Sequence, residues 1–295
     1  MKTRVLAAIV CMMAAVSFAS ADTIQGINID FVPIGHAGNA ADTDGCGWYG
    51  YPSASGAVGY NYRIGTKEIT ANQWQTINTA AGIDDTIFWS GEQPVAGVSW
   101  YSAARFCNYL TSGDKSLGAY QLGTDGSITV DRASAISAYG TVYVIPTEDE
   151  WYKAAYFKHD GSGYSLYANG TNIAPSTSDT CYSIYSSPWD VGSGTQEQNG
   201  TFDMMGNVWE WDETKIYDSY PYFYPWRGIR GGAFTSNEAP NPDFDARWNL
   251  SSYRLNATEP EGESELRGFR IASIPEPAIE ALVDINPDSL NKNSK

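Results

Sequence analysis

The chain has 295 residues, of which 42% are hydrophobic and 14% aromatic, and it carries a formal net charge of −16. This composition is typical of a globular protein with a sizeable core and excludes a disordered chain. Because so acidic a surface has few Lys and Arg side chains to neutralise phosphates, we expect no nucleic-acid partner. Calcium, cationic groups and neutral sugars remain open as ligands.

The N-terminal segment predicts export. Lys2 and Arg4 precede an apolar run at residues 5–16, and the small residues at 19–21 are typical of a signal-peptidase site. The run is shorter than the ~20 apolar residues that a membrane-spanning helix needs. We therefore expect residues 1–21 to be a signal peptide and the mature protein, without a transmembrane helix, to be secreted or held at the cell envelope. An uncleaved, tethered form is the alternative.

Three short amphipathic helices are predicted, each from a start motif followed by apolar residues at helical spacing. Thr70 with Gln73 forms a capping box before the first, the second starts near Ser99, and Thr147 with Glu150 forms a box before the third. The acidic residues 148–150 would occupy the first turn of the third helix, where carboxylates favour the positive end of the helix dipole. We interpret them as structural and not as a general acid-base pair.

The rest of the sequence is rich in turn residues. Strand-like runs occur at 141–145 and 268–273, whereas residues 160–202 show almost no periodicity. With no internal repeat and no earlier linker, residues 22–273 are predicted to form one α+β domain. Residues 274–295 form a tail that begins Ile-Pro-Glu-Pro. This start resembles the Pro-Glu-Pro signature of bacterial C-terminal sorting tails, although the transmembrane helix and basic cluster of such tails do not follow; a plain linker is the alternative.

Cysteine and histidine usage restricts the metal chemistry. Beyond the signal peptide there are three cysteines. We expect Cys107 to be a buried thiol on a helix, while pairing of Cys46 with Cys181 stays one possibility. The two histidines, His36 and His159, lie far apart and lack neighbouring ligands, so a His-based iron or zinc site is not expected.

Several motifs follow one another in a fixed order. They are QPV at 93–95, VSWYSAARFC at 98–107, IPTEDEW at 145–151, GTFDMMGNVWEW at 200–211, IRGGAF at 229–234 and GFRIA at 268–272. Together they resemble the formylglycine-generating enzyme (sulfatase-modifying factor) family. The resemblance implies an irregular α+β fold of the C-type-lectin-like kind, with short helices, small sheets, much coil and bound calcium.

The resemblance also implies where calcium would bind. The ligands would be the side chains of Asp203 and Glu210 and the backbone oxygens of Gly206 and Val208. Calcium takes 6–8 oxygen ligands, and a tight turn that contains glycine can direct several carbonyls inward. The alternative is a turn in which Asp203 only caps backbone amides.

Catalysis is where the sequence departs from the family. Active relatives oxidise a substrate cysteine to formylglycine with oxygen and a copper ion held by two cysteines shortly after the Arg-Gly-Gly motif. Ser236 and Ala246 stand at the matching positions, and no cysteine follows Cys181. Because Cu(I) prefers soft thiolates, we expect neither copper nor the family's catalytic residues. An active oxidoreductase that uses other residues is the alternative.

An aromatic segment at residues 217–226 is the remaining candidate for function. It holds six aromatic residues in ten, and Tyr and Trp provide rigid contact area for sugars or peptides. We expect it to bind a polysaccharide, a peptide or an envelope protein, or else to fold over the domain's own core. The candidate ligand-binding residues are Tyr217, Tyr220, Tyr222, Tyr224 and Trp226.

Overall fold

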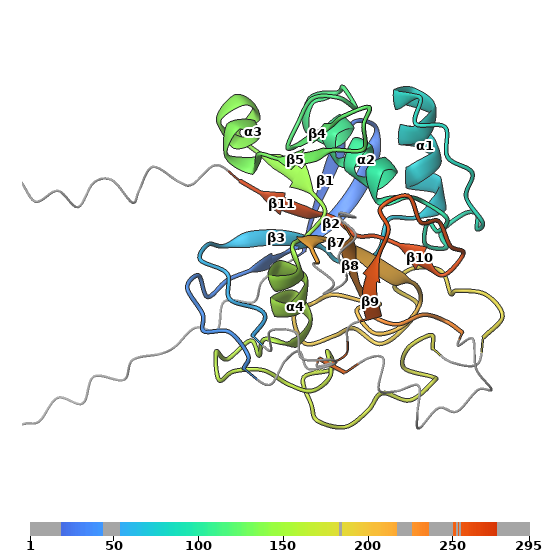
Figure 1. Ribbon diagram of the computed structural model, residues 1–295. Helices are drawn as coiled ribbons and strands as arrows, with labels where there is room; N and C mark the ends of the chain where they lie inside the picture. The colour runs from blue at the N-terminus through green and yellow to red at the C-terminus, as the bar shows by residue number, and fades with distance from the viewer. Residues whose placement is uncertain are drawn as a thin grey trace, which may run out of the picture.

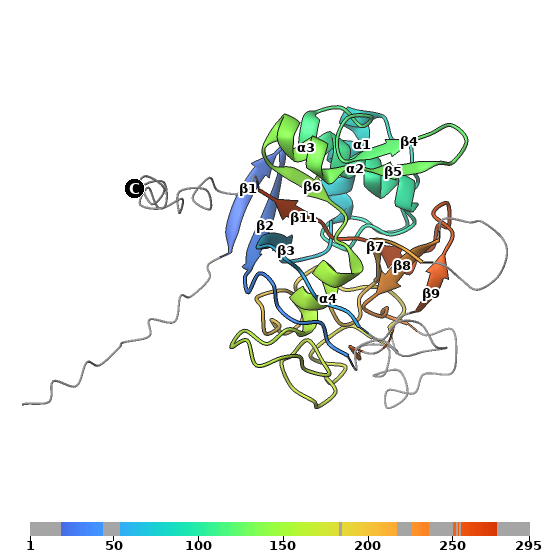
Figure 2. The same ribbon diagram turned by 60° about the vertical axis from the view of Figure 1, so that its left-hand side comes forward.

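The computed structural model describes residues 19–43, 54–182, 185–216, 226–235, 250, 251, 253 and 255–275. Two sheets and a hairpin account for the strands of the described residues (Figures 1 and 2). The five-stranded antiparallel sheet has the order β1 (Ser20–Ile24), β2 (Ile27–Ile34), β3 (Tyr62–Gly65), β11 (Ala272–Ile274) and β6 (Val142–Val144). The four-stranded sheet has the order β10 (Arg267–Gly268), β7 (Trp209–Lys215), β8 (Arg227–Arg230) and β9 (Leu255–Thr258). The hairpin pairs β4 (Tyr120–Leu122) with β5 (Ile128–Val130).

The described helices are α1 (Ala71–Ala81), α2 (Trp100–Ser112), α3 (Arg132–Tyr139) and α4 (Glu148–Tyr156). The predicted starts are confirmed, because Thr70 and Thr147 both form complete capping boxes and Ser99 caps α2. Sequence analysis missed α3, which begins after Asp131 and buries only Ala135. None of these helices is long and apolar enough to cross a bilayer.

The run at 268–273 is not one strand, and that prediction is wrong. The chain leaves the smaller sheet at the end of β10, passes through three buried residues and enters the larger sheet as β11. Phe269 is one of the three and packs edge-on against Trp74 and Phe106, with ring centroids 6.1 and 5.4 Å apart. The segment thus links the two sheets through the core. The run at 141–145 does contain a strand, β6.

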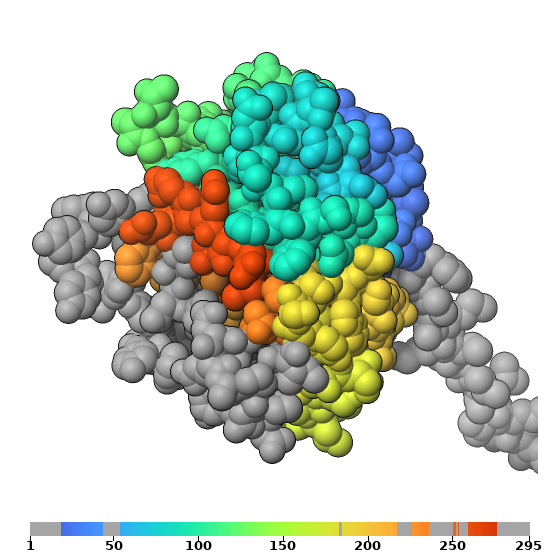
Figure 3. All heavy atoms as spheres, turned by 90° about the vertical axis from the view of Figure 1, so that its right-hand side faces the viewer, coloured from blue at the N-terminus to red at the C-terminus, as the bar shows by residue number. Residues whose placement is uncertain are grey.

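The segment between α4 and β7 is irregular, as predicted. Its described residues form a single isolated bridge, between Phe157 and Tyr164. Side chains fasten it to α4: the Asn199 amide donates to the carbonyls of Ala154 (3.0 Å) and Phe157 (2.7 Å). Figure 3 shows it, in yellow-green and yellow, packed directly below the helical part of the molecule.

Strand β1 extends the fold toward the expected signal peptide. It begins at Ser20, so the expected cleavage point after Ala21 falls within the strand, and residues 1–18 lie outside the described part. Asp22 pairs with Arg63 of β3 at 2.7 Å. Both ends of the described chain therefore lie in the same sheet, since β11 pairs with β3.

Candidate functional site

The turn that leads into β7 is held in an unusual backbone conformation. Asp203, Gly206 and Asn207 have φ angles of +62°, +92° and +58°, a region that residues other than glycine seldom adopt. A Cβ on Gly206 would collide with the carbonyl oxygen of Cys181. The backbone N–H of Asn207 donates to that same carbonyl (2.7 Å), and its Oδ1 accepts from the N–H of Trp189 (2.9 Å). The turn is therefore fixed by contacts on both sides.

Glu210 forms a bidentate ion pair with Arg270. Nε of Arg270 lies 2.6 Å from Oε2 and Nη2 lies 2.6 Å from Oε1, and both side chains are fully buried. The indole N–H of Trp151 donates to Oε2 at 2.8 Å. Arg270 also donates to the carbonyls of Gly65 (3.1 Å) and Phe202 (2.9 Å). Charge-assisted bidentate bonds of this kind are among the strongest polar contacts in a protein interior.

Three more carboxyl groups surround this ion pair: those of Glu68, Glu197 and Asp203. Burial raises the pKa of Asp203 to about 6 and the pKa of Glu197 to about 8. Burial, together with the charges of Asp203 and Glu210, holds the pKa of Glu68 well above its ordinary value. Of these four carboxyl groups, Glu210 is the one paired with Arg270, and the raised pKa values shift the other three toward their neutral acid forms. A bound cation would favour the ionised forms.

The donor atoms at the turn suit calcium, which prefers hard oxygen ligands. In the described ranges, no three His, Cys, Asp or Glu side chains are grouped as metal ligands. A cation here would therefore use backbone oxygens such as those of Gly206 and Val208 beside the Asp203 carboxylate, whose Oδ2 accepts a backbone N–H at 2.6 Å. Glu210 fits least well of the four expected ligands, because both its oxygens already accept hydrogen bonds.

The described thiols are both buried. Cys107, on α2, and Cys181 have no disulfide partner among the described residues. The buried thiol predicted at Cys107 is therefore confirmed, whereas the possible pairing of Cys181 with Cys46 stays a prediction. Burial raises the pKa of Cys181 to about 12 and that of Cys107 well above its ordinary value, which disfavours the thiolate that binds metals. Ser236 and Ala246 lie outside the described residues, as Cys46 does.

A small apolar cluster lies beside the Arg-Gly-Gly segment. It consists of Ala96, Cys181, Val208 and Phe234. Three half-buried aromatic side chains pack on it: Trp89 lies edge-on to Phe234 at 5.5 Å, and Tyr185 lies 5.1 Å from Trp189. Sequence analysis missed this group because its members come from separate irregular segments without a periodic pattern.

The aromatic segment predicted to bind a ligand is described only at its end. Trp226 is half-buried, and its carbonyl accepts the N–H of Ile216 at 2.9 Å, which closes the base of the loop between β7 and β8. The other predicted residues, which stay predictions, lie outside the described part: Tyr217, Tyr220, Tyr222 and Tyr224.

Short helices, two small sheets and a long irregular segment place this protein among the α+β proteins with a C-type-lectin-like fold. Over residues 38–274 the sequence matches the family described as "Sulfatase-modifying factor enzyme 1-like domain". The chain therefore belongs to this family, and the resemblance found in the sequence is confirmed.

Solved structures share the fold. "Treponema denticola variable protein 1" superposes with a TM-score of 0.58 at 23% identity, covering 88% of this chain and 99% of that one. CarF gives a TM-score of 0.60 at 21% identity, covering 83% and 97%, and PvdO from Pseudomonas aeruginosa gives 0.57 at 16% identity, covering 87% and 98%. The "Chaperone protein LppX" of Paenibacillus barcinonensis is 25% identical over 201 residues, which are 60% of this chain and 70% of that protein.

Proposed function

We propose that this chain is an exported, non-catalytic member of the sulfatase-modifying factor family that acts as a calcium-stabilised binding or envelope protein. The proposal rests on the number and the burial of the cysteines. No cysteine follows Cys181 in the sequence, and the thiols of Cys107 and Cys181 are buried, with raised pKa values. Without a pair of accessible soft ligands, Cu(I) has no site of the kind that the family's oxidation chemistry requires.

The binding role is supported by the framework around the β7–β8 loop. Strand β7 carries five consecutive buried residues from Trp209, and the hydrogen bond between Ile216 and Trp226 holds the ends of the aromatic loop together. A loop with fixed ends presents its side chains at a lower entropic cost than a free segment does. Export is proposed from the segment at residues 1–21.

The copper proposal is tested by introducing cysteines at positions 236 and 246, which match the copper-binding cysteines of active relatives. We expect the wild type to show negligible Cu(I) affinity in a titration against a competing chelator, and no oxygen uptake with a cysteine-containing peptide. The double variant Ser236→Cys/Ala246→Cys should bind Cu(I), whereas each single variant should not, because two thiolates are needed. Tight copper binding or peptide-dependent oxygen uptake by the wild type would instead establish the alternative, an active oxidoreductase that uses other residues.

The calcium proposal is tested by chelation. If calcium binds the native state at about 100 times its dissociation constant, it contributes ~2.7 kcal/mol, so a chelator should lower the melting temperature of the wild type. Asp203→Asn should have the lower melting temperature from the start and lose its response to chelator. Asp190→Asn, which changes an exposed carboxylate of the neighbouring segment, is the matched control and should respond as the wild type does. A wild type that melts at one temperature with and without chelator rules calcium out.

A further inference from the structure

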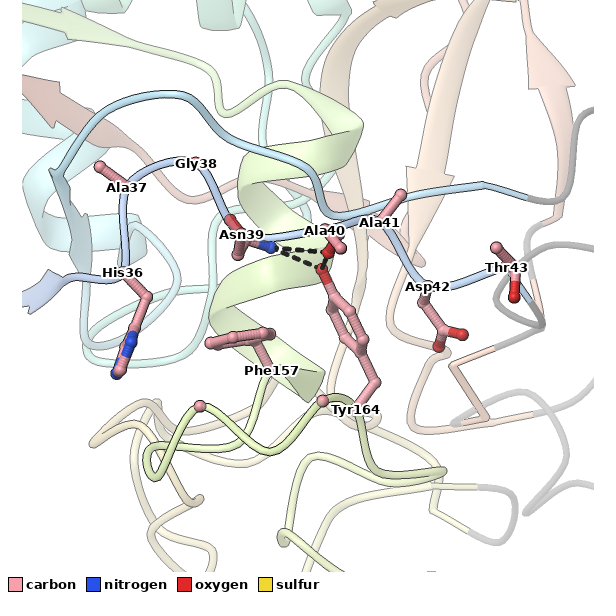
Figure 4. Close-up of a pocket in the computed structure, with 12 residues that line it drawn as sticks. His36, Ala37, Gly38, Asn39, Ala40, Ala41, Asp42, Thr43, Phe157 and Tyr164 are labelled. Atoms are coloured by element: carbon pink, nitrogen blue, oxygen red, sulfur yellow. Dashed lines mark hydrogen bonds between the residues drawn. The ribbon is translucent and has the colours of Figure 1, made fainter.

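A cavity of about 490 Å³ lies between the loop that follows β2 and the loop that follows α4 (Figure 4). Its walls are residues 36–43 on one side and Phe157, Gly161, Gly163 and Tyr164 on the other. Its size is in the range of small-molecule sites. Among the described residues it shares no lining residue with the turn at Asp203, so it is separate from that turn.

Aromatic rings form one wall of the cavity. The ring of His36 lies 5.5 Å from that of Phe157, and Phe157 lies 5.1 Å edge-on from Tyr164. The Nε2 atom of His36 is hydrogen-bonded to the carbonyl of His159 at 3.1 Å, although the side chain is exposed. Figure 4 shows the three rings on the same side of the segment at 36–43. The rings are inclined to one another by 60° and 71°, so each presents its own face or edge. An aromatic face suits the CH face of a pyranose ring.

Hydrogen bonds hold the opposite wall in place. The Asn39 amide donates to the hydroxyl of Tyr164 and to the carbonyl of Gly56, each at 2.7 Å, and its Oδ1 accepts the N–H of Val58 at 3.3 Å. The Tyr164 hydroxyl in turn donates to the carbonyl of Ala40 at 2.9 Å. The two loops are therefore tied together across the cavity, and a preformed site of this kind binds without a large ordering cost.

The charged groups near the cavity are already engaged in contacts within the protein. No Lys or Arg is among the described residues that line it, so an anion would find no direct partner. Asp42 is the acidic lining residue, and its Oδ2 already accepts the hydroxyl of Tyr152 at 2.7 Å. Behind the wall, the buried ammonium of Lys153 donates to the carbonyl of His36 at 2.9 Å and lies 5.9 Å from the ring of Phe157. That positive charge disfavours a cationic ligand.

We infer that this cavity binds a neutral saccharide of one or two pyranose rings. Aromatic rings provide the stacking surface, and six of the twelve described lining residues are Gly or Ala, which leaves backbone N–H and C=O groups close to the surface for sugar hydroxyls. The inference names a ligand class for the proposed binding role and rests on that role. It assigns the ligand to residues other than those of the aromatic segment at 217–226, however, and does not depend on the absence of copper chemistry.

The test is saturation-transfer NMR on the exported chain. The probes are glucose and N-acetylglucosamine with their β-linked dimers, and the charged counterparts glucuronate and glucosamine. We expect at least one neutral sugar to bind saturably, and its charged counterpart to bind at least about tenfold more weakly, a difference of ~1.4 kcal/mol. His36→Asn removes the ring while keeping a residue that tolerates the positive φ of +56°, and Ala40→Trp fills the cavity. Each should weaken binding by about tenfold or more.

Ala80→Trp, which changes an alanine on α1 that is also exposed, is the matched control and should bind as the wild type does. Thermal melts of all variants identify any that fail to fold, and His36→Asn keeps the test decisive if Ala40→Trp is one of them. Absence of binding by every neutral sugar, tighter binding of a charged one, or binding that survives both cavity variants overturns the inference. If Tyr220→Ala/Tyr222→Ala abolishes sugar binding while the cavity variants do not, the binding role stands and this site is wrong.

Discussion

Replacing Arg270 with methionine is expected to lower the free energy of unfolding by ~3–5 kcal/mol, the range found when one partner of a buried ion pair is removed. The change leaves Glu210 fully buried without its bidentate partner. It also withdraws the positive charge that lowers the pKa values of Glu68 and Asp203. Urea denaturation, followed by circular dichroism, measures the effect.

Two further variants show whether the loss comes from the unpaired charge. Arg63→Met removes an arginine from a half-exposed pair with Asp22, and it should cost no more than ~1 kcal/mol. The double variant Arg270→Met/Glu210→Leu removes both charges and should recover part of the stability that Arg270→Met loses. If Arg270→Met unfolds at the same urea concentration as Arg63→Met, the unpaired buried charge of Glu210 does not destabilise the fold as we expect.

The parts of the fold that sequence analysis predicted are those that local chemistry determines. A capping box needs only residues three apart, so Thr70 with Gln73 and Thr147 with Glu150 predicted the starts of α1 and α4. Helix α3 was missed for the converse reason: it is short, and with Ala135 as its one buried residue it has no apolar stripe to detect.

The parts that it could not predict depend on contacts between distant residues. Glu210 and Arg270 are 60 positions apart, and nothing in either local pattern identifies the other as its partner. The family resemblance implies that Glu210 is a calcium ligand. In the structure, its carboxylate forms an ion pair with the guanidinium of Arg270. The run at 268–273 was predicted to be one strand because its residues suit a strand, but only the packing of Phe269 shows that the chain changes sheets there.

The cavity beside residues 36–43 illustrates the same limit. In the sequence, His36 was considered only as a metal ligand, and that role was not expected because no further ligand lies at the required spacing. Its neighbours in space, Phe157 and Tyr164, are more than one hundred residues away and carry no motif. A neutral binding pocket made of aromatic and small residues leaves no signature that spacing alone could reveal.

Glu150 is where sequence and structure predict different magnitudes for the same substitution. The sequence identifies Glu150 only as the partner of Thr147 in a capping box. On that basis, Glu150→Ala should lower the free energy of unfolding by ~1 kcal/mol. In the structure the side chain is fully buried: Oε2 accepts the N–H of Thr147 (2.7 Å), and Oε1 accepts from Arg132 (2.9 Å) and from the Tyr60 hydroxyl (2.7 Å). Arg132 pairs on its other side with Glu213 at 3.0 Å.

Because Glu150→Ala would leave the largely buried Arg132 with Glu213 as its remaining carboxylate partner and withdraw the acceptor from Tyr60, we expect a loss of ~3–5 kcal/mol. Glu150→Gln keeps an oxygen for the cap while removing the charge, so it should lie between alanine and the wild type. Thr147→Ala, which removes only the hydroxyl of the cap, should cost ~1 kcal/mol. All three variants are compared by urea denaturation. If Glu150→Ala loses no more free energy of unfolding than Thr147→Ala does, the cap alone matters and the contact with Arg132 adds nothing to stability.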